Sequence, residues 1–193
     1  MGHTSPFEQC SITFEIQMPI FVMRQFVRHR TFRLNEVSAR YTELPDLFYI
    51  PEPDKWRLQD TKNKQGSTGF LHSKANNPDD MDEVYGQEAT DIVNTLCSDA
   101  YGFYQWMVKE GGIAREMARM LLPVNIYTRI MVNIDLHNLM HALRLRMDPR
   151  AQWEIQEYAR AMYTIAKKQF PVAIGCFDKY EFVLREKDGT DDQ

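Results

Sequence analysis

The chain has 193 residues and lacks most features that identify a protein from its sequence. It has only three cysteines, Cys10, Cys97 and Cys176, and none of them forms a CxxC pair, which argues against a disulfide framework. The longest apolar runs are short, and IFVM at 20–23 is followed at once by Arg24, which argues against a membrane span. The N-terminal MGHTSPFEQ lacks the basic and apolar regions of a signal peptide. We therefore expect a reduced protein in the cytoplasm.

The signature motifs of several functional classes are also absent. No GxGxxG follows a strand and no GxxxxGK[ST] occurs, so neither standard nucleotide fingerprint applies. No GxSxG surrounds Ser38, so a nucleophile elbow is not indicated. His137 and His141 are four residues apart, but they lack the HExxH glutamate and an evident third ligand, so we expect no metal site.

Hydrophobic periodicity predicts a mixture of strands and helices without regular βαβ alternation. The fold class is therefore α+β, with a central antiparallel or mixed sheet flanked by helices. The N-terminal part predicts a strand at 10–17, a helix at 20–30 with Pro19 in its first turn, and a loop and short strand at 35–41. The middle predicts a helix at about 81–109, which Gly111 and Gly112 stop, and a short helix at 113–122. The C-terminal part predicts a strand at 124–135, a helix at 136–147 capped by Asp135, and a last long helix opened by Pro149. We expect one domain over 1–193, with a variable polar loop at 59–80 and a disordered acidic tail at 186–193.

The predicted helices also carry recurring apolar positions. In the helix at about 81–109, apolar residues recur three and four apart at Ile92, Leu96, Ala100, Phe103 and Met107. The helix at 136–147 should bury Leu136, Leu139, Met140, Leu143 and Met147. In the last helix, one face is formed by Ile155, Tyr158, Ala159, Met162 and Ala166. Arg146 falls at the edge of its apolar stripe, and Leu145 faces away from it. An outward leucine beside an edge arginine indicates a second contact surface.

The most informative stretch is RHRTFRLNEVSARY at 28–41. No acidic residue and no lysine occurs from Gln17 to Asn35, although the net charge is −4. That window holds Arg24, Arg28, His29, Arg30 and Arg33. A guanidinium matches phosphate bidentately, and Ser38 with nearby backbone amides adds donors. A phosphate clamp and a solvated helix end, where each arginine stabilises the dipole by about 0.3–1 kcal/mol, are equally compatible with this composition.

These residues resemble a known family. Arg28-His29-Arg30, seven further residues and Ser38 form the RHRx7S signature of flavin-dependent thymidylate synthases. The other matching segments follow in the family's order: GHTSPFE (2–8), NEVSARY (35–41), FYIP (48–51), AREMARMLLPVNIYTR (114–129) and LRLRMDPRAQWEIQ (143–156). The resemblance covers nearly the whole chain outside 59–80 and the tail. Family members usually carry a strand and a helix before GHTSPFE, and we expect this N-terminal segment to be absent here.

The resemblance implies a homotetramer with active sites between subunits. The family makes thymidylate from dUMP, with methylenetetrahydrofolate as carbon donor and FAD, reduced by NADPH, as the source of hydride. It uses no cysteine nucleophile, which agrees with the absence of a convincing one here. The alternative is a catalytically degenerate homologue that binds nucleotide through the arginine cluster. Nucleic acid is less favoured, because the net charge is acidic and the sequence shows no obvious interleaving of aromatic residues with the arginines as stacking platforms.

The resemblance also implies site residues. FAD would contact Ser5, Arg28, His29, Arg30, Glu36, Asp135, Leu136, His137 and His141, with His3 lining the flavin pocket. The nucleotide would contact Gln25, Phe26, Val27, Arg28, Glu36, Val37, Ser38, Ala39, Arg40, Arg119 and Arg146. Ser38, Ala39 and Arg40 would lie near its phosphate. Arg146 would be catalytic, because a cation at the pyrimidine edge stabilises the anionic ring as carbon 5 becomes nucleophilic. A structural ion pair with Asp148 is the alternative for Arg146.

Overall fold

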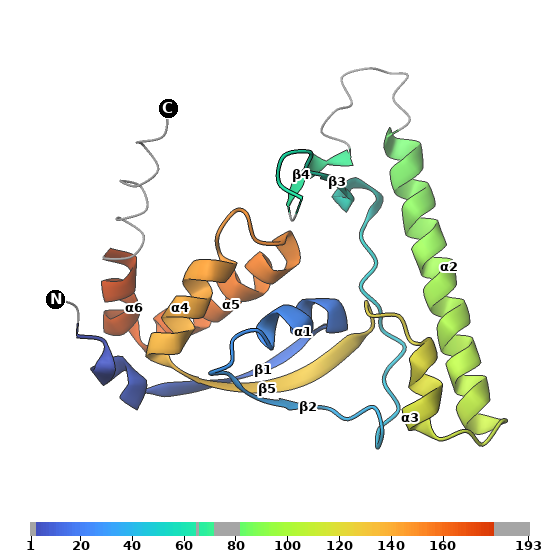
Figure 1. Cartoon of the computed structure of the whole chain (residues 1–193), viewed down its shortest axis with the longest axis horizontal. Coiled ribbons are helices and arrows are strands. Elements are labelled where there is room, and N and C mark those ends of the chain that lie inside the picture. Colours follow the sequence, from blue (N-terminus) through green and yellow to red (C-terminus); the bar gives the residue numbers. More distant parts are fainter. Residues whose placement is uncertain (1–2, 65, 72–81, 180–193) are drawn as a thin grey trace. The chain divides into compact units, whose positions relative to one another are not determined.

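The computed structural model describes residues 3–64, 66–71 and 82–179. The chain combines helices with antiparallel strand pairing (Figure 1), which confirms the α+β prediction. It divides into two compact units. Unit 1 contains Met1–Ile16, Gln25–Asn35 and Met131–Gln193, and unit 2 contains Gln17–Arg24 and Glu36–Ile130. The predicted tail at 186–193 lies outside the described residues, as do residue 65 and residues 72–80 of the predicted 59–80 loop.

Three strands form a sheet, and its two longest strands are β1 and β5. The strand order is β1 (Ser11–Pro19), β5 (Tyr127–Asp135) and β2 (Arg33–Glu36), with β5 in the middle (Figure 1). Alternate residues of β1 are buried, including Phe14 and Ile16, while the residues between them are exposed. The predicted strand is therefore confirmed. Pro19, however, is the last residue of β1 and not the first turn of a helix.

The helix after β1 is shorter than its periodicity predicted. Helix α1 (Ile20–Phe26) ends four residues before Arg30, so Arg28, His29 and Arg30 lie on a turn. In this turn, the His29 N–H donates to the Phe26 carbonyl at 2.9 Å, and the Phe32 N–H donates to the His29 carbonyl at 2.9 Å. The rings of Phe26 and Phe32 are both buried, with centroids 5.7 Å apart. This tertiary packing overrides helix propensity and leads the chain into β2.

The helices of unit 1 pack in a series. The 3₁₀ helix η1 (Ser5–Gln9) packs on α4 (Leu136–Arg146), α4 packs on α5 (Trp153–Gln169), and α5 packs on α6 (Pro171–Phe177). The Asp135 carboxylate accepts from the Asn138 N–H at 2.9 Å, so the predicted N-cap is confirmed. Pro149 does not open the last long helix, which begins at Trp153.

The predicted faces of these helices are largely correct. Leu136, Leu139 and Leu143 are buried, whereas Met140 and Met147 are only half-buried. On α5, the predicted face is buried at Ile155, Ala159, Met162 and Ala166 and half-buried at Tyr158. The described part of the chain contains no helix with the length and apolar character needed to cross a bilayer.

Unit 2 is organised around α2 (Asp82–Lys109), which confirms the predicted long helix. It is followed by Gly111 and Gly112, and Gly112 has a φ of 61°, a conformation that favours glycine. Three positions of the predicted apolar stripe are exposed: the exposed fractions of Ile92, Leu96 and Phe103 are 58%, 61% and 62%. Ala100 and Met107 are half-buried. The opposite side is buried through Tyr101 and Tyr104, which pack with Ala118.

Shorter elements complete unit 2. Helix α3 (Arg115–Ala118) and the 3₁₀ helix η4 (Arg119–Leu121) form the predicted short helix before Pro123, and the 3₁₀ helix η2 (Pro53–Lys55) packs on α2. Strands β3 (Arg57–Gln59) and β4 (Ser67–Phe70) pair as an antiparallel hairpin. The prediction of a loop is therefore wrong at 67–70, because polar, exposed residues form a strand there by backbone pairing.

Candidate active site

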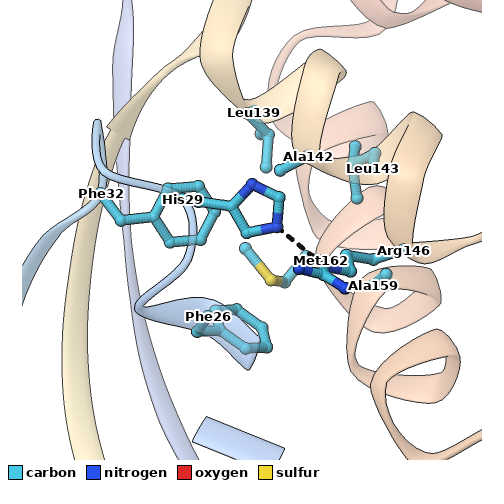
Figure 2. A pocket seen from close by; sticks show the side chains of 9 residues that line it. All are labelled: Phe26, His29, Phe32, Leu139, Ala142, Leu143, Arg146, Ala159 and Met162. Atoms are coloured by element: carbon cyan, nitrogen blue, oxygen red, sulfur yellow. Dashed lines mark hydrogen bonds between the residues drawn. The ribbon is translucent and has the colours of Figure 1, made fainter. Parts of the chain in front are cut away.

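Arg146, the last residue of α4, contacts His29 in unit 1 (Figure 2). Its Nε–H donates to His29 Nε2 at 2.9 Å, and Nη2 donates to the Gln25 carbonyl at 3.2 Å. Asp148 instead accepts from Arg150, at 3.0 Å from both Nε and Nη2. Burial lowers the pKa of Arg146 below its usual range. The guanidinium is therefore held by neutral acceptors.

The imidazole of His29 lies in a small apolar pocket beside Arg146 (Figure 2). The pocket is lined by Phe26, Phe32, Leu139, Ala142, Leu143, Ala159 and Met162 together with His29 and Arg146. The His29 ring stacks on Phe32, with centroids 5.0 Å apart and planes 24° apart. Burial, with smaller effects of Arg146 and His141, lowers the pKa of His29 to about 4. The ring is therefore neutral at pH 7.

A chain of hydrogen bonds supports Gln25. Gln25 Nε2 donates to Gln152 Oε1 at 2.6 Å, and Gln152 Nε2 donates to Glu154 Oε2 at 2.9 Å. Glu154 is buried, with 6% of its surface exposed. Sequence analysis did not identify Gln152 or Glu154 as site residues. Their only signal was a place within the matching segment LRLRMDPRAQWEIQ.

The remaining nucleotide-binding candidates of unit 1 differ in accessibility. Phe26 is buried and lines the His29 pocket, so its side chain has a packing role. Val27 is exposed on the turn. Arg28 and Arg30 are also exposed, and neither side chain has a hydrogen bond or ion pair with any residue that the structure describes. These two guanidiniums are available to an anionic ligand.

The FAD candidates on η1 and α4 belong to elements that pack together. Ser5 and His3 are exposed, His137 is half-buried, and His141 Nδ1 lies 3.2 Å from Arg144 Nη2. Leu136 is fully buried, and its N–H donates to the Cys10 carbonyl at 2.9 Å.

Asp135 caps the N-terminus of α4. It uses both carboxylate oxygens to accept from Asn138, which lowers its pKa despite partial burial. A flavin nucleotide fits this set chiefly through the unpaired guanidiniums of Arg28 and Arg30, which match the charge of a diphosphate. The side chains of Asp135 and Leu136 serve the fold.

The phosphate-binding candidates lie in unit 2, on the turn after β2. Glu36 Oε1 accepts from Thr128 Oγ1 at 2.7 Å, and the Val37 N–H donates to the Arg129 carbonyl at 2.9 Å. Ser38 Oγ accepts from the Arg40 N–H at 3.3 Å. The N–H groups of Ser38 and Ala39 donate to nothing within the described parts of the chain. These two amides are therefore available as donors to an anion.

Arg40 has a carboxylate partner in unit 2. Its Nε and Nη2 lie 3.1 and 2.8 Å from Glu116 Oε2, and the side chains of both residues are about half exposed. Arg119 is exposed three residues after Glu116, and its side chain makes no contact of this kind with the described residues. Residues three apart share a helix face, so Arg119 lies on the same face as Glu116, the partner of Arg40.

The chain is similar to proteins of known activity. Residues 1–172 match the family model Thy1, described as thymidylate synthase complementing protein. A flavin-dependent thymidylate synthase of Thermus thermophilus is 46% identical over 178 residues, which are 92% of this chain and 60% of that protein. The enzyme of the same name from Wolbachia pipientis wMel is 44% identical over 181 residues, 92% of this chain and 59% of that protein. The chain therefore spans about 60% of the length of these relatives.

A solved structure shows the same fold. The UMP/dUMP methylase PolB from Streptomyces cacaoi, in a crystal structure bound with 5-Br UMP, is 34% identical and superposes with a TM-score of 0.78. The match covers 92% of this chain and 76% of that chain. The fold prediction, which the sequence resemblance carried, is thereby confirmed. From the family model and the relatives together, the chain belongs to the Thy1 family of thymidylate synthase complementing proteins, which includes the flavin-dependent thymidylate synthases.

Proposed function

We propose that this protein is a flavin-dependent thymidylate synthase that converts dUMP to thymidylate. The observation that carries the proposal is the environment of Arg146, whose guanidinium is oriented by His29 and the Gln25 carbonyl without a neutralising carboxylate. A preorganised cation of this kind stabilises negative charge that develops on a bound pyrimidine. Arg146 therefore acts on the ring as carbon 5 becomes nucleophilic.

The other residues have binding roles in this proposal. The unpaired N–H groups of Ser38 and Ala39, with Arg40 and Arg119, bind the nucleotide phosphate. Ser38 acts as a phosphate ligand and not as a nucleophile, because its hydroxyl is an acceptor within its own turn and no described base contacts it. Arg28 and Arg30 bind the anionic part of FAD, while Glu36 supports the turn through Thr128.

The cofactor and co-substrates follow from family membership. FAD, reduced by NADPH, supplies the hydride, and methylenetetrahydrofolate supplies the carbon. The proposed assembly is a homotetramer with active sites between subunits, and the exposed Leu145 beside Arg146 agrees with a contact surface there. The three cysteines are free thiols, which agrees with a reducing cytoplasmic environment.

Product formation tests the proposal directly. Purified protein is incubated with dUMP, FAD, NADPH and methylenetetrahydrofolate, and thymidylate is measured by chromatography. We expect thymidylate to form and to require all four components. UMP is tested in parallel, because the similar PolB is named as a methylase of both nucleotides. Binding of dUMP without any thymidylate would support the catalytically degenerate alternative and refute the enzyme.

A further inference from the structure

We propose that His29 is a positioning residue for Arg146, which it orients as a neutral imidazole that accepts the Arg146 Nε–H on Nε2 and carries its own hydrogen on Nδ1. The inference rests on the proposed function for what Arg146 does to the substrate. The family resemblance placed His29 at the flavin. In this structure, its Nε2 is already used at 2.9 Å by Arg146.

The hydrogen bond fixes the state of the imidazole ring. Arginine has only donors, so the His29 Nε2 must present a lone pair to Arg146. An imidazolium has no lone pair, and a ring with its hydrogen on Nε2 would point that hydrogen at the guanidinium. The only state compatible with the geometry is a neutral ring with its hydrogen on Nδ1.

The surroundings favour that neutral state. Apolar side chains from α4 and α5 line the pocket, and Phe32 stacks on the ring (Figure 2). The titratable groups that act on His29 are Arg146 and His141, both of which oppose a second positive charge and lower its pKa together with burial. Packing against Phe32 limits ring rotation, so Nε2 keeps its direction.

A neutral partner suits the proposed role of Arg146. A carboxylate would orient the guanidinium equally well, but it would neutralise the charge that the pyrimidine requires. The neutral imidazole of His29 orients the Arg146 guanidinium and adds no negative charge. Arg146 uses Nε and Nη2 for its two contacts, and Nη1 has no acceptor within the residues that the structure describes. The outer edge of the guanidinium therefore stays available to the substrate.

The first test needs no activity. Nitrogen-15 NMR of the histidine ring in the purified wild-type protein reads which nitrogen carries hydrogen, and the Arg146 Nε–H signal is assigned by its loss in Arg146→Lys. At pH 7, we expect His29 to be neutral with hydrogen on Nδ1. A His29 imidazolium, or hydrogen on Nε2, would overturn the proposal whatever reaction the protein catalyses.

The second test uses three substitutions of His29. The amide of Gln reaches the place of Nε2, whereas the shorter Asn reaches only that of Nδ1, and Leu has no acceptor. Release of tritium from dUMP labelled at carbon 5 is measured with FAD content and the KM for dUMP. We expect His29→Leu and His29→Asn to lower kcat about tenfold or more, with His29→Gln recovering most of it and FAD content unchanged.

The outcomes separate this proposal from the proposed function. Equal activity of the Gln, Asn and Leu variants would overturn the positioning role. Loss of bound FAD with unchanged tritium release per flavin would also overturn it and return His29 to the cofactor. A wild-type protein that makes no thymidylate would refute the proposed function, and the NMR result would still decide the state of His29.

Discussion

The two units hold their key arginines in different ways. In unit 1, Arg146 is half-buried and contacts only neutral acceptors, the His29 ring and the Gln25 carbonyl. In unit 2, Arg40 is exposed and paired with the Glu116 carboxylate. The contacts of Arg146 fix the orientation of its guanidinium and leave its positive charge without a neutralising carboxylate, which suits stabilisation of a transient anion. The pair of Arg40 with Glu116 suits exchange of one anion for another, because exposed ion pairs are weak.

From the contrast between the two arginines, we expect the largest effect on dUMP binding from substitution of Arg40. Arg40→Ala removes the charge-assisted contact that we propose to the phosphate, so the KM for dUMP should rise about tenfold or more with little change in kcat. Binding of deoxyuridine, which has no phosphate, should not change. Arg150→Ala is the matched control, because Arg150 is also an exposed arginine paired with a carboxylate. An equal loss of deoxyuridine binding in Arg40→Ala would contradict the phosphate role.

The support behind Arg146 is tested by stability. Gln152→Leu removes a hydrogen bond from Gln25 and another from the buried Glu154. We expect the free energy of unfolding to fall by about 1–3 kcal/mol, because buried polar groups lose partners. Urea denaturation measures the change, and Lys168→Leu, at an exposed site on α5, is the control. Equal stability of both variants would show that the chain of hydrogen bonds does not support this site.

The neutral state of His29 predicts a pH dependence. Burial lowers the pKa of His29 from its usual 6.5 to about 4 in the folded protein, so the unfolded chain binds the proton more readily. The stabilising contribution is fully present above pH 6.5 and is lost as the pH falls toward 4. Between pH 7 and 5, the wild type should lose about 1–2 kcal/mol more stability than His29→Gln. Parallel losses in urea denaturation at both pH values would contradict the neutral ring.

The smallest effect concerns the partner of Arg40. Glu116→Gln releases Arg40 from a surface ion pair worth about 0.2–1 kcal/mol, so dUMP should bind up to about fivefold more tightly. Calorimetry of dUMP binding measures this gain. Glu157→Gln, which breaks the exposed pair with Arg160, should leave binding unchanged. Weaker binding of dUMP by Glu116→Gln would mean that Glu116 itself assists the nucleotide.

The regular elements could be predicted because local patterns specify them. Alternation of apolar and polar residues predicted β1, and Asp135, as a capping residue, predicted the start of α4. The end of α1 could not be predicted, because it depends on packing of Phe26 against Phe32, which periodicity does not encode. The buried face of α2 was missed for a similar reason: Tyr101 gains a partner in the Leu44 carbonyl at 2.8 Å, far away in sequence.

The family resemblance proposed the members of the site, but it could not indicate which of them contact one another. The RHRx7S match proposed His29 and the matching segment at 143–156 proposed Arg146, yet no spacing indicated that residues 117 positions apart share a hydrogen bond. Gln152 and Glu154 were missed because an isolated glutamine and glutamate resemble an ordinary helix start. The pairing of Arg40 with Glu116 was also invisible, since it depends on the fold of unit 2.

The most direct test of the central claim is tritium release from dUMP labelled at carbon 5, compared between the wild type, Arg146→Ala and Arg150→Ala. Arg146→Ala should reduce the release about 100-fold or more, while its circular dichroism and FAD content match the wild type. Arg150→Ala, four residues away and exposed, should release tritium at the wild-type rate. Unchanged release in a folded, flavin-loaded Arg146→Ala protein would contradict the account.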